Sequence, residues 1–153
     1  MERKKRILLT GMSGVGKSAL LEQLRDGGTL CLDLDEEGWK TPEGLFRIER
    51  ILAWMDAHPD RNLVLAGCEE NQGALYPFLD AVLLLTAPPE VMRERIRTRK
   101  NPYGKRPEEW NRIAADKERF EPLIARGCTA VIDTGGSLDA AAEEIRRFLR
   151  ETA

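Results

Sequence analysis

Short apolar runs alternate with longer amphipathic segments along the chain. Five runs of four or five mostly apolar residues are expected to form strands, and they lie at residues 6–10, 30–34, 63–66, 82–85 and 130–133. The runs at 63–66 and 82–85 contain no polar residue. Continuous apolar character is typical of strands that are covered on both faces, as in a parallel sheet.

Segments with helical spacing separate these runs. Apolar residues that recur every three or four positions predict helices over residues 18–25, 42–57, 89–99, 107–126 and 137–151. Pro42 suits the first position of the second helix, and we expect Pro122 to kink or split the fourth. The alternation of strands and helices predicts a single α/β domain over residues 1–153, with a five-stranded parallel sheet flanked by helices.

The composition narrows the class of protein. With 153 residues, 42% of them hydrophobic, and a formal net charge of −2, the chain has the content of one folded domain and is not intrinsically disordered. A pI near 5.6 argues against general nucleic-acid binding. The longest apolar run, at residues 81–85, is too short to cross a membrane. The cysteines are odd in number and include no Cys-x-x-Cys pair, so we expect reduced thiols in a cytoplasmic protein.

The first apolar run leads directly into the glycine-rich sequence GMSGVGKS at residues 11–18. This sequence fits G-x-x-x-x-G-K-[ST], the P-loop or Walker A pattern, whose backbone N–H groups turn toward phosphate oxygens. The helix that follows adds a positive dipole end. We expect Lys17 to reach the β- and γ-phosphates of ATP and the Ser18 hydroxyl to ligate Mg²⁺. The expected nucleotide-binding residues are Gly11, Ser13, Gly14, Val15, Gly16, Lys17, Ser18, Ala19 and, from a later segment, Arg99.

Other motifs separate the classes of P-loop protein. The guanine-binding motif N-K-x-D of GTPases is absent, and the D-x-x-G sequence at residues 133–136 is interpreted as a turn. The chain resembles the superfamily of P-loop small-molecule kinases that includes shikimate, gluconate and adenylate kinases. The resemblance implies the three-layer P-loop NTPase fold and transfer of the γ-phosphoryl group of ATP to a hydroxyl of a small molecule, with Mg²⁺.

Two carboxylates, Asp33 and Asp35, come at the end of the second predicted strand. Residues two apart on a strand share a face, and ligands of such sheets bind at the carboxyl ends of the strands. The resemblance implies that Asp33 supports Mg²⁺ and that Asp35 orients and deprotonates the acceptor hydroxyl. The alternative is that both residues only form a turn.

A basic segment that ends in a cluster of turn residues supplies a candidate lid near residues 99–107. Arg95 and Arg99 are four positions apart and share a helix face. The resemblance implies that Arg99 lies over the adenine or the phosphates, and that Lys105 or Arg106 closes on the transferring phosphoryl group. The alternatives are a solvated basic helix or an RNA-binding patch.

The acceptor region departs from the resemblance. Shikimate kinases have a run of glycines after the third strand, where this chain has GCEENQG at residues 67–73. Carboxylates there would repel an anionic acceptor unless arginines pair with it. The arginines considered for that pairing are Arg47, Arg50, Arg119 and Arg126. The expected acceptor-binding residues are Asp35, Arg47, Gly67, Asn71 and Arg126. An acidic acceptor and a neutral or cationic alcohol both stay open.

The expected catalytic residues are Lys17, Asp35, Arg99 and Arg106, and the expected metal ligands are Ser18 and Asp33. The expected partners are ATP and a small-molecule acceptor. Two alternatives to a small-molecule kinase are a nucleotide-binding ATPase or regulatory module, whose acceptor site is vestigial or serves a protein, and a nucleoside or RNA-end kinase.

Overall fold

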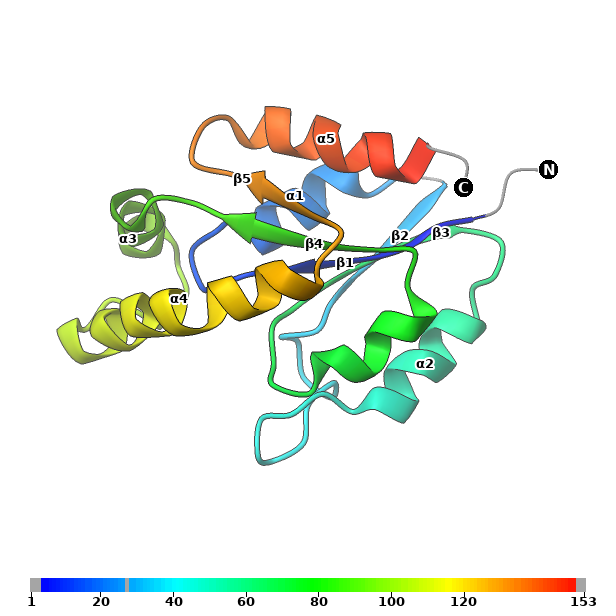
Figure 1. Cartoon of the computed structure of the whole chain (residues 1–153), viewed down its shortest axis with the longest axis horizontal. Helices are drawn as coiled ribbons and strands as arrows, with labels where there is room; N and C mark the ends of the chain where they lie inside the picture. Colours follow the sequence, from blue (N-terminus) through cyan, green and yellow to red (C-terminus); the bar gives the residue numbers. More distant parts are fainter. Residues whose placement is uncertain (1–3, 27, 151–153) are drawn as a thin grey trace.

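The computed structural model describes residues 4–26 and 28–150 and contains a five-stranded parallel sheet (Figure 1). The strands are β1 (Arg6–Thr10), β2 (Thr29–Asp33), β3 (Asn62–Ala66), β4 (Ala81–Thr86) and β5 (Ala130–Asp133). Their order across the sheet is β2-β3-β1-β4-β5, and every neighbouring pair is parallel. The predicted strands and their parallel arrangement are confirmed.

Helices cover both faces of the sheet. They are α1 (Lys17–Leu24), α2 (Ile48–Asp56), the 3-10 helix η1 (Gln72–Phe78), α3 (Pro89–Thr98), α4 (Pro107–Gly127) and α5 (Leu138–Arg150). Figure 1 shows α1 and α5 on one side of the sheet, with α2 and η1 on the other. This is the expected three-layer α/β architecture. The predicted end of the last helix, Glu151, lies outside the described residues.

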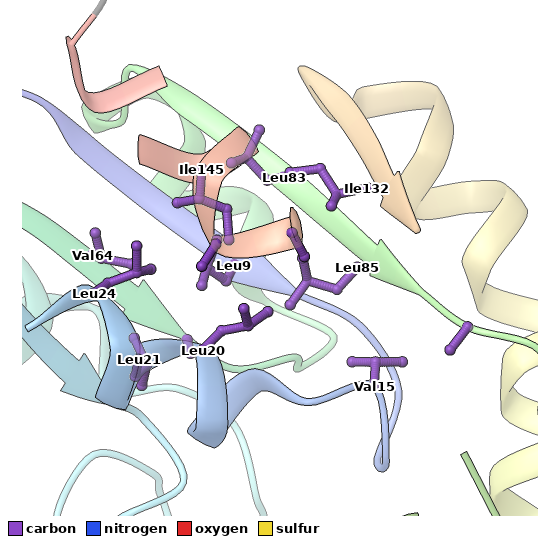
Figure 2. Packing of buried hydrophobic residues seen from close by; sticks show 14 of the residues in the cluster. Leu9, Val15, Leu20, Leu21, Leu24, Val64, Leu83, Leu85, Ile132 and Ile145 are labelled. Carbon is purple, nitrogen blue, oxygen red and sulfur yellow. The ribbon is translucent and has the colours of Figure 1, made fainter. Parts of the chain in front are cut away.

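The alternation of side chains along each strand creates two hydrophobic clusters. On β1, Ile7 and Leu9 point to the side of α1 and α5, whereas Leu8 points to the side of α2. Figure 2 shows Leu9 packed among residues of α1 and α5, including Leu20 and Ile145. These side chains have almost no exposed surface, and burying each one contributes about 1.5–3 kcal/mol relative to leaving it in water.

The predicted helix over residues 42–57 is wrong in its first half. Helix α2 begins only at Ile48, and the residues before it fold into a tight turn. The Thr41 N–H donates to the Leu45 carbonyl, and the Leu45 N–H donates to the Thr41 hydroxyl. Gly44 has a φ of +87°, which no right-handed helix contains. The turn folds back as a hairpin, in which Lys40 and Phe46 form an isolated antiparallel bridge.

Pro122 neither ends nor splits helix α4, which continues to Gly127. A proline inside a helix leaves the carbonyl four residues earlier without its N–H donor. Here Pro122 and Glu118 are both exposed, so water can hydrate that carbonyl. Helix η1 was not predicted, and it contains Pro77. Among the described residues, no helix combines the length and the apolar character needed to cross a membrane.

Candidate functional site

The P-loop joins the central strand β1 to helix α1. Gly14 and Gly16 have φ values of +93° and +98°, in the left-handed region that favours glycine. A Cβ on Gly14 would also lie 2.9 Å from the Met92 carbonyl oxygen. Helix α1 begins at Lys17, directly after the loop. The predicted nucleotide-binding residues from Gly11 to Ala19 are therefore brought together in one loop and the first turn of a helix.

The Lys17 ammonium lies over this loop. Its Nζ donates to the carbonyl oxygens of Gly11 and Met12, at 2.5 and 3.0 Å. Burial lowers the pKa of Lys17, and the nearby charges of Asp35 and Asp33 oppose that shift. A buried ammonium gains strongly from an added anion. Phosphate oxygens would thus be better partners than the two carbonyls.

Ser18 and Asp33 bring two oxygens together at the carboxyl end of the sheet. The Ser18 hydroxyl donates to Asp33 Oδ2 over 3.0 Å. No group of three or more His, Cys, Asp or Glu side chains that could hold a metal occurs in residues 4–26 and 28–150. Mg²⁺ in nucleotide sites is commonly held by one or two protein oxygens together with phosphates and waters. The Ser18 and Asp33 oxygens fit such a site.

Asp35 lies two residues beyond the end of β2. Its backbone N–H donates to Asp33 Oδ1 over 2.9 Å, which ties the Asp33 carboxylate to the turn that follows β2. The Lys40 ammonium then joins Asp35 Oδ1 to Glu69 Oε2, over 2.7 and 2.6 Å. Burial by itself would lower the pKa of Lys40, but the hydrogen bonds to Asp35 and Glu69 outweigh it, and the pKa is raised. Lys40 thus connects the segments that follow β2 and β3.

Arg99 connects the P-loop to the candidate lid. Its guanidinium donates to the Ser13 hydroxyl over 3.1 Å and to the Tyr103 carbonyl over 2.6 Å. Lys105 Nζ donates back to the Arg99 carbonyl over 2.6 Å. Arg106 is exposed at the start of α4, where its backbone N–H donates to Glu109, and no hydrogen bond joins it to the P-loop. The structure therefore brings Arg99 to the phosphate site, but not Arg106.

The sequence-based predictions missed the role of Arg95, which lies on α3 one turn before Arg99, the residue that caps the end of this helix. Its guanidinium donates to the Val15 carbonyl and to the Thr134 hydroxyl, each over 3.2 Å, and also contacts the Thr134 carbonyl. The Thr134 hydroxyl in turn donates to the Val15 carbonyl over 2.6 Å. Arg95 and Thr134 thus both bind the Val15 carbonyl of the P-loop. The helical spacing of Arg95 and Arg99 was the available signal.

The predicted acceptor residues Gly67 and Asn71 both lie against Phe46 in this structure. Asn71 accepts from the Phe46 N–H at 3.0 Å and donates to the Phe46 carbonyl at 2.9 Å. A Cβ on Gly67 would lie 2.9 Å from the Phe46 ring and 3.0 Å from the Leu34 Cβ. Phe46 is buried, so these residues shape the wall between the ends of β2 and β3.

The structure does not bring Arg126 to the site. It lies in the last turn of α4, which returns the chain to the amino end of β5. Thr129 confirms this, because its N–H donates to the Val82 carbonyl and its hydroxyl accepts from the Val82 N–H. Val82 lies near the start of β4, at the amino ends of the strands, and the P-loop lies at their carboxyl ends. Arg47 is exposed, and its Nε donates to the Lys40 carbonyl over 3.1 Å. The order of elements along the chain could have excluded Arg126.

Residues 7–119 match the family model AAA_18, described as an AAA domain. The chain belongs to this AAA domain family. No curated protein matches this AAA-domain chain in sequence.

Solved structures with the same fold as this AAA-domain chain include several kinases. Shikimate kinase from Acinetobacter baumannii, in complex with shikimate, is 21% identical with a TM-score of 0.70, and the match covers 95% of this chain and 93% of that one. Shikimate kinase from Bacteroides thetaiotaomicron is 19% identical with a TM-score of 0.67, covering 96% and 99%. A gluconokinase from Sinorhizobium meliloti 1021 is 20% identical with a TM-score of 0.66, covering 97% and 93%. These likenesses confirm the expected P-loop fold.

Proposed function

We propose that this protein is a cytoplasmic, Mg²⁺-dependent kinase that transfers the γ-phosphoryl group of ATP to a hydroxyl of a small molecule. The observation that carries the proposal is the contact of Ser18 Oγ with Asp33 Oδ2, with the backbone of Asp35 hydrogen-bonded to Asp33 Oδ1. A metal-ligand pair and a second carboxylate then border the phosphate loop, which is the arrangement that phosphoryl transfer to a hydroxyl needs.

In the proposed reaction, the Ser18 and Asp33 oxygens would hold Mg²⁺, which neutralises phosphate charge when it is bound. Asp35 takes the proton of the acceptor hydroxyl as that oxygen forms a bond to the γ-phosphorus. The bond from the γ-phosphorus to the oxygen shared with the β-phosphate breaks, and ADP leaves with that oxygen. Lys17 and Arg99 stabilise the charge on the phosphoryl oxygens, and lid closure would add Lys105 or Arg106.

The test is phosphorylation of a metabolite pool with labelled ATP and Mg²⁺, with the wild type beside Asp35→Asn. We expect a labelled small-molecule ester with the wild type and a large loss with the variant. Labelled inorganic phosphate as the only product, formed equally by both proteins, would contradict the kinase function.

A second candidate is a nucleotide-binding ATPase or regulatory module. One observation favours it: Asp35 is already engaged in an ion pair with Lys40 over 2.7 Å. In that case Asp35 stabilises the hairpin and has no acceptor to position. Equal ATP affinity and equal slow hydrolysis in the wild type and Asp35→Asn would support this candidate.

A further inference from the structure

The proposed general base, Asp35, is not held in place by the strand that precedes it. It lies two residues beyond β2, and 52% of its side chain is exposed. Among the residues that the structure describes, the one side-chain partner of its carboxylate is Lys40, whose Nζ donates to Oδ1 over 2.7 Å. A general base must lie within hydrogen-bond reach of the proton that it takes. The orientation of this base therefore depends on Lys40.

The ion pair with Lys40 leaves the second oxygen of Asp35 available. Within residues 4–26 and 28–150, no group donates a hydrogen bond to Asp35 Oδ2. The carboxylate also lies near the phosphate loop: burial lowers the pKa of Lys17, and among the nearby charges that of Asp35 opposes this shift most. One oxygen of Asp35 is thus held by Lys40, and the other can accept a proton from the acceptor hydroxyl.

Lys40 is itself held between two carboxylates from different parts of the chain. Its Nζ lies 2.6 Å from Glu69 Oε2 and 2.7 Å from Asp35 Oδ1. The side chains of Lys40 and Glu69 are 27% and 24% exposed, so water screens their pairing less than that of two fully exposed charges. The flexible lysine side chain is thereby fixed at its charged end.

The hairpin before α2 fixes Lys40 at its backbone. Lys40 and Phe46 form the antiparallel bridge of this hairpin, and the Arg47 N–H donates to the Trp39 carbonyl over 2.9 Å. Asn71 binds the backbone of the buried Phe46 through both the N–H and the carbonyl. The backbone of Lys40 is therefore tied to the segment that follows β3, the same segment that supplies Glu69.

Glu69 is anchored to the strand that leads into the P-loop. Gln72 Oε1 accepts hydrogen bonds from the Glu69 N–H and from the Thr10 hydroxyl, each over 3.1 Å. Thr10 ends β1 directly before Gly11 and is fully buried, and Gln72 is 5% exposed. Breaking buried hydrogen bonds is costly, because the freed groups stay away from water. The backbone of Glu69 is thus kept in place relative to the P-loop.

We infer that Lys40 is a positioning residue, which holds the Asp35 carboxylate beside the P-loop by linking it to Glu69. The inference rests on the proposed kinase function, because it concerns the orientation of the base in that reaction. Without the ammonium, Asp35 loses its side-chain partner, and the carboxylates of Asp35 and Glu69 repel each other. Transfer then falls, while Mg·ATP is still bound by the P-loop, Ser18 and Asp33.

The first test measures single-turnover transfer from γ-labelled ATP, with Mg²⁺ and the metabolite pool. Lys40→Met should lower transfer about 10-fold or more, the value of one lost hydrogen bond to a charged group, with affinity for Mg·ATP changed less than about 2-fold. Lys40→Arg, whose guanidinium can also join two carboxylates, should restore most of the rate. The control is Lys4→Met, the same substitution at an exposed lysine at the other end of the sheet. Equal transfer by Lys40→Met and Lys4→Met overturns the inference.

A double variant separates positioning from a purely structural role. If Lys40 acts through Asp35, then Lys40→Met should lower transfer by less than about 2-fold when Asp35→Ala is already present. A lysine that only stabilises the hairpin would lower transfer by the same factor in both backgrounds, and that result overturns the inference while the kinase function stands. No labelled ester from the wild type overturns the kinase function, and the inference falls with it.

Discussion

The guanidinium of Arg99 donates a hydrogen bond to the hydroxyl of Ser13, 3.1 Å away, although 86 positions separate the two residues. The same guanidinium reaches the Tyr103 carbonyl. One side chain therefore joins the phosphate loop to the segment that follows α3. Any ligand that changes the position of Arg99 is expected to change the order of that segment.

The first prediction concerns this segment. Hydrogen exchange over residues 100–106 should slow when ATP and Mg²⁺ bind, because phosphates give the lid cations new partners. Arg99→Ala should speed exchange there in the free protein about 10-fold, the value of one lost hydrogen bond to a charged group. The control is Arg97→Ala, since Arg97 pairs only with Glu94 on an exposed helix surface. Equal exchange with and without nucleotide would contradict a lid.

The second prediction is that Lys17→Ala lowers ATP turnover about 10²-fold or more, because a positioned cation is lost from the phosphoryl oxygens. Lys17 contacts only loop carbonyls through its hydrogen bonds, so thermal unfolding should change little. Turnover and melting temperature measured on Lys17→Ala beside Lys4→Ala, an exposed lysine at the other end of the sheet, separate the two effects. Normal turnover in Lys17→Ala would exclude the P-loop assignment.

A third prediction divides the two carboxylates. Asp33→Asn should weaken Mg·ATP binding, because it removes charge from the Ser18–Asp33 oxygen pair. Asp35→Asn should leave Mg·ATP affinity nearly unchanged and lower phosphoryl transfer about 10²–10⁴-fold, the usual contribution of a general base. Calorimetry of Mg·ATP binding, with single-turnover transfer, measures both. The division of roles is wrong if the two variants lose Mg·ATP affinity equally.

The fourth prediction compares Gly67, which follows β3, with Gly73 in η1. Gly67→Ala should destabilise the fold by about 1–3 kcal/mol, the usual cost of overpacking, because its methyl group would lie 2.9 Å from the Phe46 ring. Gly73→Ala is the control, since a Cβ there meets no atom within 4 Å. Urea unfolding should give that control equal or slightly higher stability. Equal losses in the two variants would mean that contact with Phe46 is not the cause.

The fifth prediction concerns Cys31. Burial raises the pKa of its thiol to about 11, and raising the pKa of an acid favours its neutral form. Since the thiolate is the nucleophile, only about 1% of Cys31 should be reactive at pH 9, where a thiol with an ordinary pKa of 9.0 is half ionised. Alkylation against pH, followed by mass spectrometry in folded and urea-unfolded protein, should give midpoints near 11 and 9. A midpoint near 9 in the folded protein would contradict the effect of burial.

The sequence predicted the sheet and the P-loop because both depend on local features. Apolar runs such as residues 82–85 can only be buried, and Gly14 and Gly16 adopt backbone angles that other residues avoid. The hairpin before α2 was not predicted, because Leu45 and Ile48 continue the helical spacing of the residues after them. Gly44 is a local signal against a helix there, and the amide of Asn71, which binds the Phe46 backbone, is distant in the sequence.

Side-chain pairs were harder to predict than elements. The Lys40 bridge depends on Glu69, almost 30 positions later, and nothing local links the two residues. Arg126 was predicted to bind the acceptor because it comes shortly before the fifth strand. In a parallel sheet, however, a residue before a strand lies at the amino ends of the strands, and the P-loop lies at their carboxyl ends. Arg95 lay within reach of prediction, because it shares a helix face with Arg99.

The two faces of the sheet divide the hydrophobic core into two separate clusters. The P-loop residue Val15 and the helices α1 and α5 belong to one hydrophobic cluster. Leu34 and Phe46, which lie against Gly67 after β3, belong to the other. We expect a graft of the hairpin and the loop after β3 from another member of the fold to change the molecule that is phosphorylated while nucleotide affinity is kept. Such a division lets new substrates be acquired without rebuilding the chemistry, and it makes this chain a suitable scaffold for directed evolution.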